Sequence, residues 1–259
     1  MHFEQMTVDG VFIEHAAPET DPVAPPIVFV HGAGHGSWVW ENHLRYFAAQ
    51  GRNCYAFSWF NHRGSRDLPA GEFLKRSLVD TVEELETVVG VAGEPPVLIT
   101  HSMGAIVAQK YAENHPVAAQ IHITPAICAE VGLDVDVEID PTTPVNSGPF
   151  ERAWELYLGG ASEEDARRYH ALLSDESPRA IKEGVNALVS VDRTRLGGPS
   201  LFIAAEHDVI VRAEAVRRSA DWFGSDYLFL HDRSHNVALE PRWRETADRI
   251  QSWLTHKTW

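Results

Sequence analysis

Short apolar runs alternate with helical patterns along most of this 259-residue chain. Each run has the length and apolar content of a buried β-strand, and helix-like periodicity fills most of the stretches between them. The runs are IVFV (27–30), NCYAFSWF (53–60), PPVLIT (95–100), AQIHITPA (119–126), PSLFIAAE (199–206) and DYLFLHD (226–232). This alternation predicts an α/β fold, with a mostly parallel sheet covered by helices on both faces.

Residues 2–16 follow a different pattern. Two short runs flank Asp9-Gly10, a dipeptide that suits the tight turn of a β-hairpin. We therefore expect an antiparallel hairpin at the edge of the sheet. Together with the six runs above, it brings the predicted number of strands to eight.

Strand patterns stop at about residue 129 and resume after residue 198. Within this stretch, Ser162 and Ser177 each precede residues typical of a first helical turn. The sequence thus predicts an α/β core made of residues 1–128 and 199–259. Residues 129–198 are predicted to form a helical insertion.

The pentapeptide THSMG (100–104) lies between an apolar strand pattern and a helical pattern. Small residues beside a serine permit a turn tight enough to raise its hydroxyl above the carboxyl edge of the sheet. The positive end of the next helix faces the hydroxyl there. These features predict that Ser102 is a nucleophile.

A serine hydroxyl is a poor nucleophile at neutral pH unless a base and an orienting carboxylate support it. Asp208 follows one strand pattern and His235 follows the last one, so both are expected at the same edge of the sheet as Ser102. Glu206 and Asp232 are close enough in sequence to compete for these roles. We predict a triad of Ser102, Asp208 and His235, with Glu206 as the main alternative acid.

The glycine loop HGAGHG (31–36) follows the first parallel strand pattern. Acyl transfer passes through a tetrahedral oxyanion that needs two backbone N–H donors, one after the nucleophile and one from a loop after an early strand. We predict that the amides of Ala33 and Met103 are these donors. A dinucleotide-binding loop is disfavoured, because the Gly-x-Gly-x-x-Gly spacing is missing and no acidic residue ends the next strand pattern.

Two histidine pairs have the separation of helix-borne zinc ligands, His31 with His35 and His231 with His235. Both pairs lie in predicted loops, and no glutamate completes a zinc-protease pattern. We therefore expect neither a metal nor another cofactor.

Together these motifs resemble the α/β-hydrolase superfamily over nearly the whole chain. The stretch HGAGHGSWVWE (31–41) is similar to a loop of plant methyl esterases and hydroxynitrile lyases. Residues 46–65 and 235–254 resemble small bacterial hydrolases of the lysophospholipase-like kind. The resemblance implies an α/β-hydrolase fold in which residues 129–198 form a small helical cap over the nucleophile.

The same resemblance leaves two reactions to separate, ester hydrolysis and cleavage of a carbon-carbon bond. The lyases carry a threonine where this chain has Gly32, and a lysine follows their catalytic histidine where this chain has Asn236. The hydroxyl and the cation that handle cyanohydrin and cyanide are therefore missing, which favours the esterase.

Aromatic residues near strand ends and on the insertion are candidates for substrate contact. These are His35, Trp38, Trp59, Trp154 and Tyr157. The helical spacing around Trp154 and Tyr157 is more typical of core packing than of a pocket roof. Where relatives tend to show a glycine-rich pattern, this chain has Asn61-His62, a departure whose effect on specificity the sequence does not explain.

Acidic residues outnumber basic ones by 37 to 22, and the formal net charge is −15. Such a surface repels nucleic acid and anionic membranes, so we expect neither as a partner. Cys54 and Cys128 are expected to be buried small hydrophobes rather than ligands or a disulfide. Because no signal-peptide pattern and no run of about 18 apolar residues is present, we expect a cytoplasmic protein, either a monomer or a homodimer.

The sequence thus predicts a serine hydrolase that cleaves a small, moderately apolar ester through an acyl-enzyme. Lactones, thioesters and amides are further substrates that suit this chemistry. Two alternatives stay open. One is a lyase or other non-hydrolytic enzyme that uses the triad as a general base, and the other is a non-catalytic ligand receptor.

Overall fold

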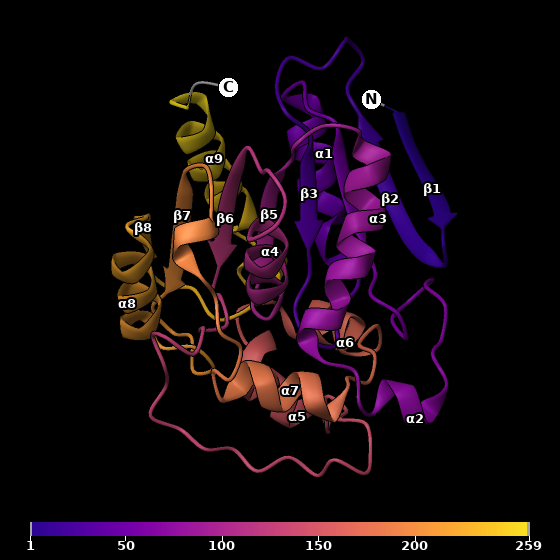
Figure 1. Ribbon diagram of the computed structural model, residues 1–259, viewed down its shortest axis with the longest axis vertical. Coiled ribbons are helices and arrows are strands. Elements are labelled where there is room, and N and C mark those ends of the chain that lie inside the picture. Colours follow the sequence, from indigo (N-terminus) through magenta and orange to yellow (C-terminus); the bar gives the residue numbers. More distant parts are fainter. Residues whose placement is uncertain (1, 258–259) are drawn as a thin grey trace.

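Eight strands form one sheet in the order β1-β2-β4-β3-β5-β6-β7-β8 (Figure 1). The computed structural model describes residues 2–257. β1 pairs antiparallel with β2, and β2 with β4, whereas every other pair is parallel. The strands are β1 (His2–Val8), β2 (Val11–Ala17), β3 (Ile27–Val30), β4 (Cys54–Phe57), β5 (Val97–His101), β6 (Ala119–Ile123), β7 (Ser200–Ala205) and β8 (Asp226–Leu230). The predicted eight-stranded, mostly parallel sheet is confirmed.

The N-terminal hairpin closes one edge of this sheet, as the Asp9-Gly10 pair predicted. Val8 pairs with Val11 across the turn. Both turn residues have positive φ, 50° for Asp9 and 84° for Gly10, which a two-residue type I′ turn requires. The turn residues therefore set the register of the hairpin.

Helices cover both faces of the sheet (Figure 1). Ile27 and Phe29 of β3 belong to the apolar cluster under α1 and α9, and Val28 and Val30 belong to the cluster under α3 and α4. The helices of the core are α1 (Glu41–Ala49), α2 (Ala70–Phe73), α3 (Val82–Ala92), α4 (Gly104–Ala112), α8 (Ala213–Phe223) and α9 (Trp243–Thr255), with 3-10 turns η1 (Ser37–Trp40), η2 (Leu78–Thr81) and η5 (Val237–Leu239). Across residues 2–257, every helix is too short or too polar to cross a membrane.

Residues 129–198 lie between β6 and β7 in the chain, and they are called the cap segment here after the role that the resemblance predicts for them. Its elements are α5 (Phe150–Ala153), the π-helical turn η3 (Trp154–Leu158), α6 (Glu163–His170), α7 (Pro178–Val185) and the 3-10 turn η4 (Arg193–Arg195). α6 and α7 begin where predicted, because the hydroxyls of Ser162 and Ser177 accept the amides of Asp165 and Ala180. Figure 1 shows α5, α6 and α7 beyond the carboxyl ends of the parallel strands.

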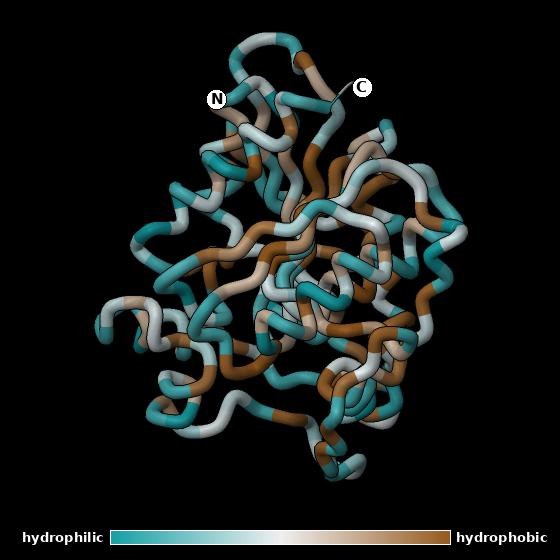
Figure 2. The backbone as a smooth tube through the Cα atoms, turned by 90° about the vertical axis from the view of Figure 1, so that its left-hand side faces the viewer, coloured by the Kyte–Doolittle hydropathy of each residue, from teal (hydrophilic) through white to brown (hydrophobic). Residues whose placement is uncertain are grey.

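Figure 2 shows hydrophobic residues concentrated in the centre of the molecule and hydrophilic ones in the peripheral loops.

Some strands are shorter than the apolar runs that predicted them. β4 ends at Phe57, because the amide of Trp59 donates to the ring of His31 (3.1 Å) instead of continuing the ladder. β6 ends at Ile123, because Thr124 has a positive φ of 43°. The remainders of both runs thus become loops at the carboxyl edge of the sheet.

Candidate active site

Ser102 lies on a sharp turn between β5 and α4, as predicted. Its φ of 51° is in the left-handed region, which is strained for a residue with a side chain. At Gly104, a Cβ would meet the carbonyl oxygen of Val30 at 2.6 Å, so only glycine lets α4 begin this close to β3. Thr100 stands where the usual motif has glycine, and its hydroxyl lies 2.9 Å from His122 Nδ1 inside the sheet. Thr100 is a strand residue, so no glycine is needed there.

Ser102, His235 and Asp208 form one hydrogen-bonded chain. His235 Nε2 lies 3.1 Å from Ser102 Oγ, and His235 Nδ1 lies 2.9 Å from Asp208 Oδ2. Asp208 Oδ1 accepts the amides of Ile210 (2.8 Å) and Val211 (2.9 Å), so the carboxylate has a fixed orientation. A carboxylate on Nδ1–H leaves the Nε2 lone pair toward the hydroxyl, which is the tautomer that can take the serine proton.

The backbone carbonyl of His235 accepts two side-chain hydrogen bonds. His101 Nε2 donates to it at 3.1 Å and Thr124 Oγ1 donates to it at 2.9 Å. The amide and hydroxyl of the preceding residue, Ser234, both donate to Glu240 Oε1 at 2.7 Å. The loop after β8 is therefore fixed by side chains from β5, from the loop after β6 and from the chain that follows.

The glycine loop lies directly against the serine. A Cβ on Gly32 would lie 2.7 Å from Ser102 Cβ and 2.9 Å from His101 Nδ1. Among residues 2–257, the amides of Ala33 and Met103 donate to no other protein group. Two unengaged amides thus occur, one next to Gly32 and one next to Ser102, which is what an oxyanion site requires.

This geometry agrees with comparison to known proteins. A family model described as the alpha/beta hydrolase family matches residues 27–250. The chain belongs to the α/β-hydrolase family.

Solved structures of that family share its fold at low sequence identity. A monoacylglycerol lipase from Paleococcus ferrophilus is 20% identical, with a TM-score of 0.72 over 98% of both chains. A thermophilic esterase from Thermogutta terrifontis is 17% identical, with a TM-score of 0.71 over 98% of both chains. An enol-lactonase from Burkholderia xenovorans LB400 is 13% identical, with a TM-score of 0.74 over 98% of this chain and 100% of the other. Comparison with curated proteins gives no match.

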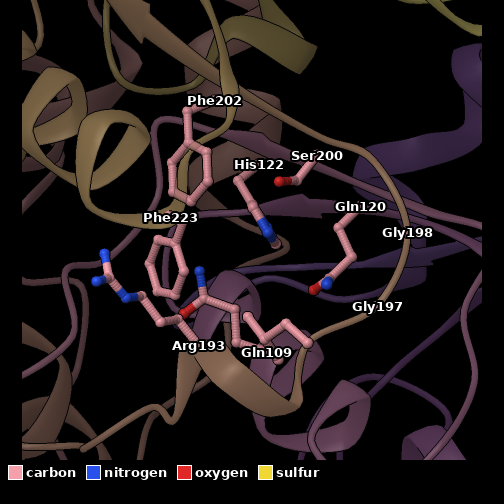
Figure 3. Close-up of a pocket in the computed structure, with 10 residues that line it drawn as sticks. Gln109, Gln120, His122, Arg193, Gly197, Gly198, Ser200, Phe202 and Phe223 are labelled. Atoms are coloured by element: carbon pink, nitrogen blue, oxygen red, sulfur yellow. The ribbon is translucent and has the colours of Figure 1, made fainter.

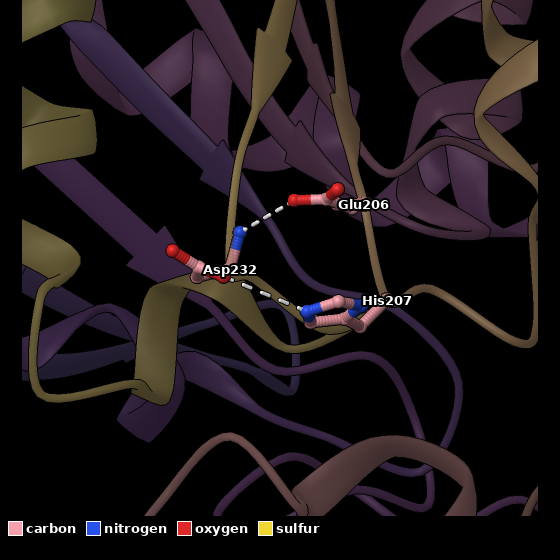
Figure 4. A group of neighbouring side chains, drawn as sticks. All are labelled: Glu206, His207 and Asp232. Atoms are coloured by element: carbon pink, nitrogen blue, oxygen red, sulfur yellow. Dashed lines mark hydrogen bonds and ion pairs between the residues drawn. The ribbon is translucent and has the colours of Figure 1, made fainter.

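The competing acids of this α/β-hydrolase lie outside the hydrogen-bonded chain. Glu206 accepts the amide of Asp232 at 3.0 Å, and His207 lies 3.8 Å from the Asp232 carboxylate (Figure 4). These three residues are the group of the described chain whose ligand atoms come close enough to share a metal ion. All three are exposed and connect the loop after β7 to the loop after β8. Their contacts hold these two loops together.

The rings of the two histidines in the glycine loop bind different protein groups. His31 donates from Nδ1 to the carbonyl of Gly32 (2.8 Å), and its Nε2 accepts the amide of Trp59. His35 donates from Nδ1 to the carbonyl of Ala33 (2.7 Å), which leaves its buried Nε2 as a lone pair without a partner in the described chain. Burial lowers the pKa of His35 to about 4, so the ring is neutral at pH 7.

The other predicted contact residues lie in two places. Trp38 stacks between His35 and Tyr169 of α6, with ring centroids 5.5 and 5.9 Å apart. Trp59 is almost fully buried against His31 in the apolar cluster under α3 and α4. Trp154 and Tyr157 are partly buried and pack against the cluster under α1 and α9. Trp38 alone among the tryptophans of this group bridges the glycine loop and a cap helix.

A separate cavity lies at the opposite edge of the sheet. Gln120 and Ser200 at the starts of β6 and β7 line it, together with Gln109, His122 and Phe223 (Figure 3). Its volume is about 50 Å³, which is room for a few water molecules and too little for an ester substrate.

Sequence reasoning missed one pair of residues near the site. His62 and Glu176 form a buried contact between the loop after β4 and the cap segment, 3.1 Å apart. The only signal at the sequence level was the Asn61-His62 departure, and nothing marked Glu176.

Proposed function

We propose that this α/β-hydrolase cleaves a small-molecule ester through an acyl-enzyme on Ser102. The observation that carries the proposal is the unbroken hydrogen-bonded chain from Ser102 through His235 to Asp208. In this mechanism His235 accepts the serine proton, protonates the leaving group and later activates water. Asp208 holds the reactive tautomer and stabilises the imidazolium. Lactones and thioesters pass through the same intermediates.

The proposed oxyanion donors are the amides of Ala33 and Met103. Developing charge on the substrate oxygen needs donors that are already oriented and not otherwise engaged. Both amides meet the second condition. The similar structures named above include a lipase, an esterase and a lactonase, and their chemistry supports a carboxylic-ester type of substrate.

We further propose that the cap segment roofs this site and that His35 contacts the substrate. Because its Nδ1–H is committed to the carbonyl of Ala33, His35 presents Nε2 as an acceptor. The proposed substrate therefore carries a hydroxyl or N–H donor on an otherwise moderately apolar frame. Trp38, and on the cap Trp154 and Tyr157, supply apolar surface in this proposal.

The lyase alternative receives no support from the residues at its two diagnostic positions. Gly32 offers no hydroxyl, and a side chain there would collide with Ser102. Asn236 is 2% exposed and offers an uncharged amide in place of a cation.

The test begins with a fluorophosphonate probe and intact mass measurement. We expect the wild-type protein to gain one adduct and Ser102→Ala to gain none. We then expect turnover of p-nitrophenyl esters, with 3-hydroxybutyrate preferred over butyrate, and loss of that preference in His35→Phe. No adduct and no turnover would refute the hydrolase, and an adduct without ester turnover would favour a non-hydrolytic enzyme.

A further inference from the structure

A buried ion pair joins the cap segment to the loop after β4. His62 Nε2 lies 3.1 Å from Glu176 Oε2, and the side chains are 1% and 5% exposed. The two residues are 114 positions apart in the chain. Charged groups are rarely buried this completely unless a partner compensates them. Each member of this pair therefore depends on the other.

The hydrogen bonds of His62 require both ring nitrogens to carry protons. Nδ1 faces the carbonyl of Phe60 at 3.0 Å and Nε2 faces Glu176, and both partners are acceptors. Burial opposes this charge, but the charge of Glu176 and the hydrogen bonds outweigh it and raise the pKa of His62. Burial likewise opposes ionisation of Glu176, and the charge of His62 and donated hydrogen bonds lower its pKa.

Three other titratable groups lie near the pair, and the charge of one of them, Glu84, adds to that of Glu176 in raising the pKa of His62. His31 lies beside His62, with ring centroids 5.2 Å apart, and burial lowers the pKa of His31 well below its usual value. His35 is likewise neutral at pH 7. Glu84 accepts the amide of Phe60 and is paired with Arg76 at 2.6 Å.

Glu176 also holds the glycine loop. Its Oε2 accepts the amide of Gly34 at 3.2 Å, and its Oε1 accepts the amide of Ser177 at 3.0 Å. The amide of Ser174 donates to the carbonyl of Gly34 at 2.8 Å. Glu176 is itself fixed by a two-way backbone bridge to Val145, at 2.9 and 2.8 Å. Both polar backbone groups of Gly34 are therefore bound to the cap segment.

These contacts bear directly on the amide of Ala33. The peptide unit after Ala33 is held at both ends, by His35 on its carbonyl and by Glu176 on the Gly34 amide. The peptide unit before Ala33 is held at its carbonyl, because Gly32 O accepts His31 Nδ1 (2.8 Å) and the amide of His35 (3.2 Å). The unit before Ala33 is thus held at its carbonyl, and the unit after Ala33 is held at both its carbonyl and its amide. Together these contacts set the direction of the Ala33 N–H. Glu176 is the only charged group in this set of contacts.

We propose that Glu176, supported by His62, is a positioning residue for catalysis that orients the Ala33 amide toward the oxyanion. This inference rests on the proposed function, because it needs an oxyanion to be formed. The cap segment then supplies part of the catalytic geometry, besides covering the site.

The experiment compares Glu176→Gln with the matched control Glu183→Gln. Glu183 is also a cap carboxylate that contacts the core, but it accepts the hydroxyl of Ser77 (2.7 Å) and the amide of Leu78 (2.8 Å), far from the glycine loop in sequence. Turnover of a p-nitrophenyl ester by the wild-type protein is measured first. If the wild type fails there, the proposed function fails; the variants test only the role of Glu176.

We expect Glu176→Gln to lower kcat by about 10- to 100-fold, since small displacements of an oxyanion donor have effects of this size. KM should change by less than about twofold. Binding of a trifluoromethyl ketone, which forms an oxyanion on Ser102, should weaken in parallel with kcat/KM, while binding of the matching methyl ketone should not change. Glu183→Gln should resemble the wild type in all four measurements.

Three results would overturn the inference: an unchanged kcat in Glu176→Gln, equal weakening of both ketones, or the same loss in Glu183→Gln. If Glu176→Gln does not fold, His62→Gln provides the same test. It keeps the Glu176 carboxylate but removes its counter-charge, so it should lower kcat and trifluoromethyl ketone binding together by a smaller factor. Unchanged kcat in a folded His62→Gln would then count against the proposal.

Discussion

The two sides of the candidate site are built by different means. On the sheet side, Ser102, Asp208 and His235 each lie within five residues of the end of a strand. Backbone hydrogen bonds hold the turns that carry them, and side chains from β5 and from the loop after β6 also hold the His235 carbonyl. On the cap side, the approach to the site depends on individual side chains, chiefly Glu176. The sheet side is thus positioned mainly by the ends of neighbouring strands, and the cap side by single contacts.

This difference has an energetic consequence. Strand ends are held by many ladder hydrogen bonds at once, so one substitution shifts them little. The cap side includes an ion pair whose two members are both buried, and removal of either member leaves an uncompensated charge. Substitutions on the sheet side should therefore change the chemistry without unfolding the protein, and those on the cap side should alter geometry.

The largest effect is expected from Asp208→Asn. The backbone amides of Ile210 and Val211 would hold the asparagine oxygen, so its NH₂ would face His235 Nδ1 and force the proton onto Nε2. The ring could then no longer accept the serine proton, and kcat should fall by about 10⁴-fold. Glu206→Gln, measured beside it with the same ester, should keep its rate. The reverse ranking would show that Glu206 is the acid.

An intermediate effect is expected where the two sides meet, in Gly32→Ala. The new Cβ would lie 2.7 Å from Ser102 Cβ and 3.1 Å from the backbone oxygen of His101, so the loop or the turn must move. A displacement near 1 Å at a reacting centre costs about 10²-fold in kcat. Gly90→Ala in α3 is the control, because its Cβ would have no neighbour within 4 Å. A fully active Gly32→Ala would contradict this prediction, because it would mean that the glycine loop can move away from Ser102 without loss of activity.

The smallest effect is expected in the pH dependence of stability. Burial lowers the pKa of His43 to about 3, so this ring binds a proton only when the protein unfolds. Its contribution is complete above the unfolded pKa of about 6.5 and is lost as the pH falls, by about 1.4 kcal/mol per pH unit. Urea unfolding of His43→Leu between pH 6.5 and 4.5 should show a flatter slope than the wild type. The control Leu44→Ala in the same helix removes buried packing but no titratable group, so it should keep the wild-type slope.

His62, which contacts the cap segment through Glu176, should change stability with pH in the opposite direction to His43. Its pKa is raised, so its contribution to stability is present at low pH and lost as the pH rises through the raised value. If the pH dependence of stability in His43→Leu equals that of the wild type, the contrast between neutral His43 in α1 and charged His62 beside Glu176 does not hold.

The contrast also explains how much the sequence could predict. Ser102, Asp208 and His235 were found because strands have readable patterns and parallel strands end at a common edge. The hairpin followed from Asp9-Gly10, since few residue pairs suit two positive φ angles. Local rules of this kind need no knowledge of the distant chain.

The contacts of the cap segment obey no local rule. Nothing near Glu176 in the sequence indicates that its carboxylate meets His62 or the amide of Gly34. Trp154 and Tyr157 had the helical spacing that is typical of core packing, and their side chains do pack on the core cluster. The spacing did not show that the turn they occupy is π-helical.

The place where the cap segment leaves the sheet has a consequence for engineering. It connects β6 to β7, two neighbouring strands, so a recombination experiment could exchange it as a cassette for that of another family member. The cassette, however, contains Glu176, whereas Gly34 and His62 stay with the recipient. A chimera would inherit a new segment and a buried His62 ring without its counter-charge. The role proposed for Glu176 predicts that such a chimera regains full activity only after a carboxylate is restored at that position.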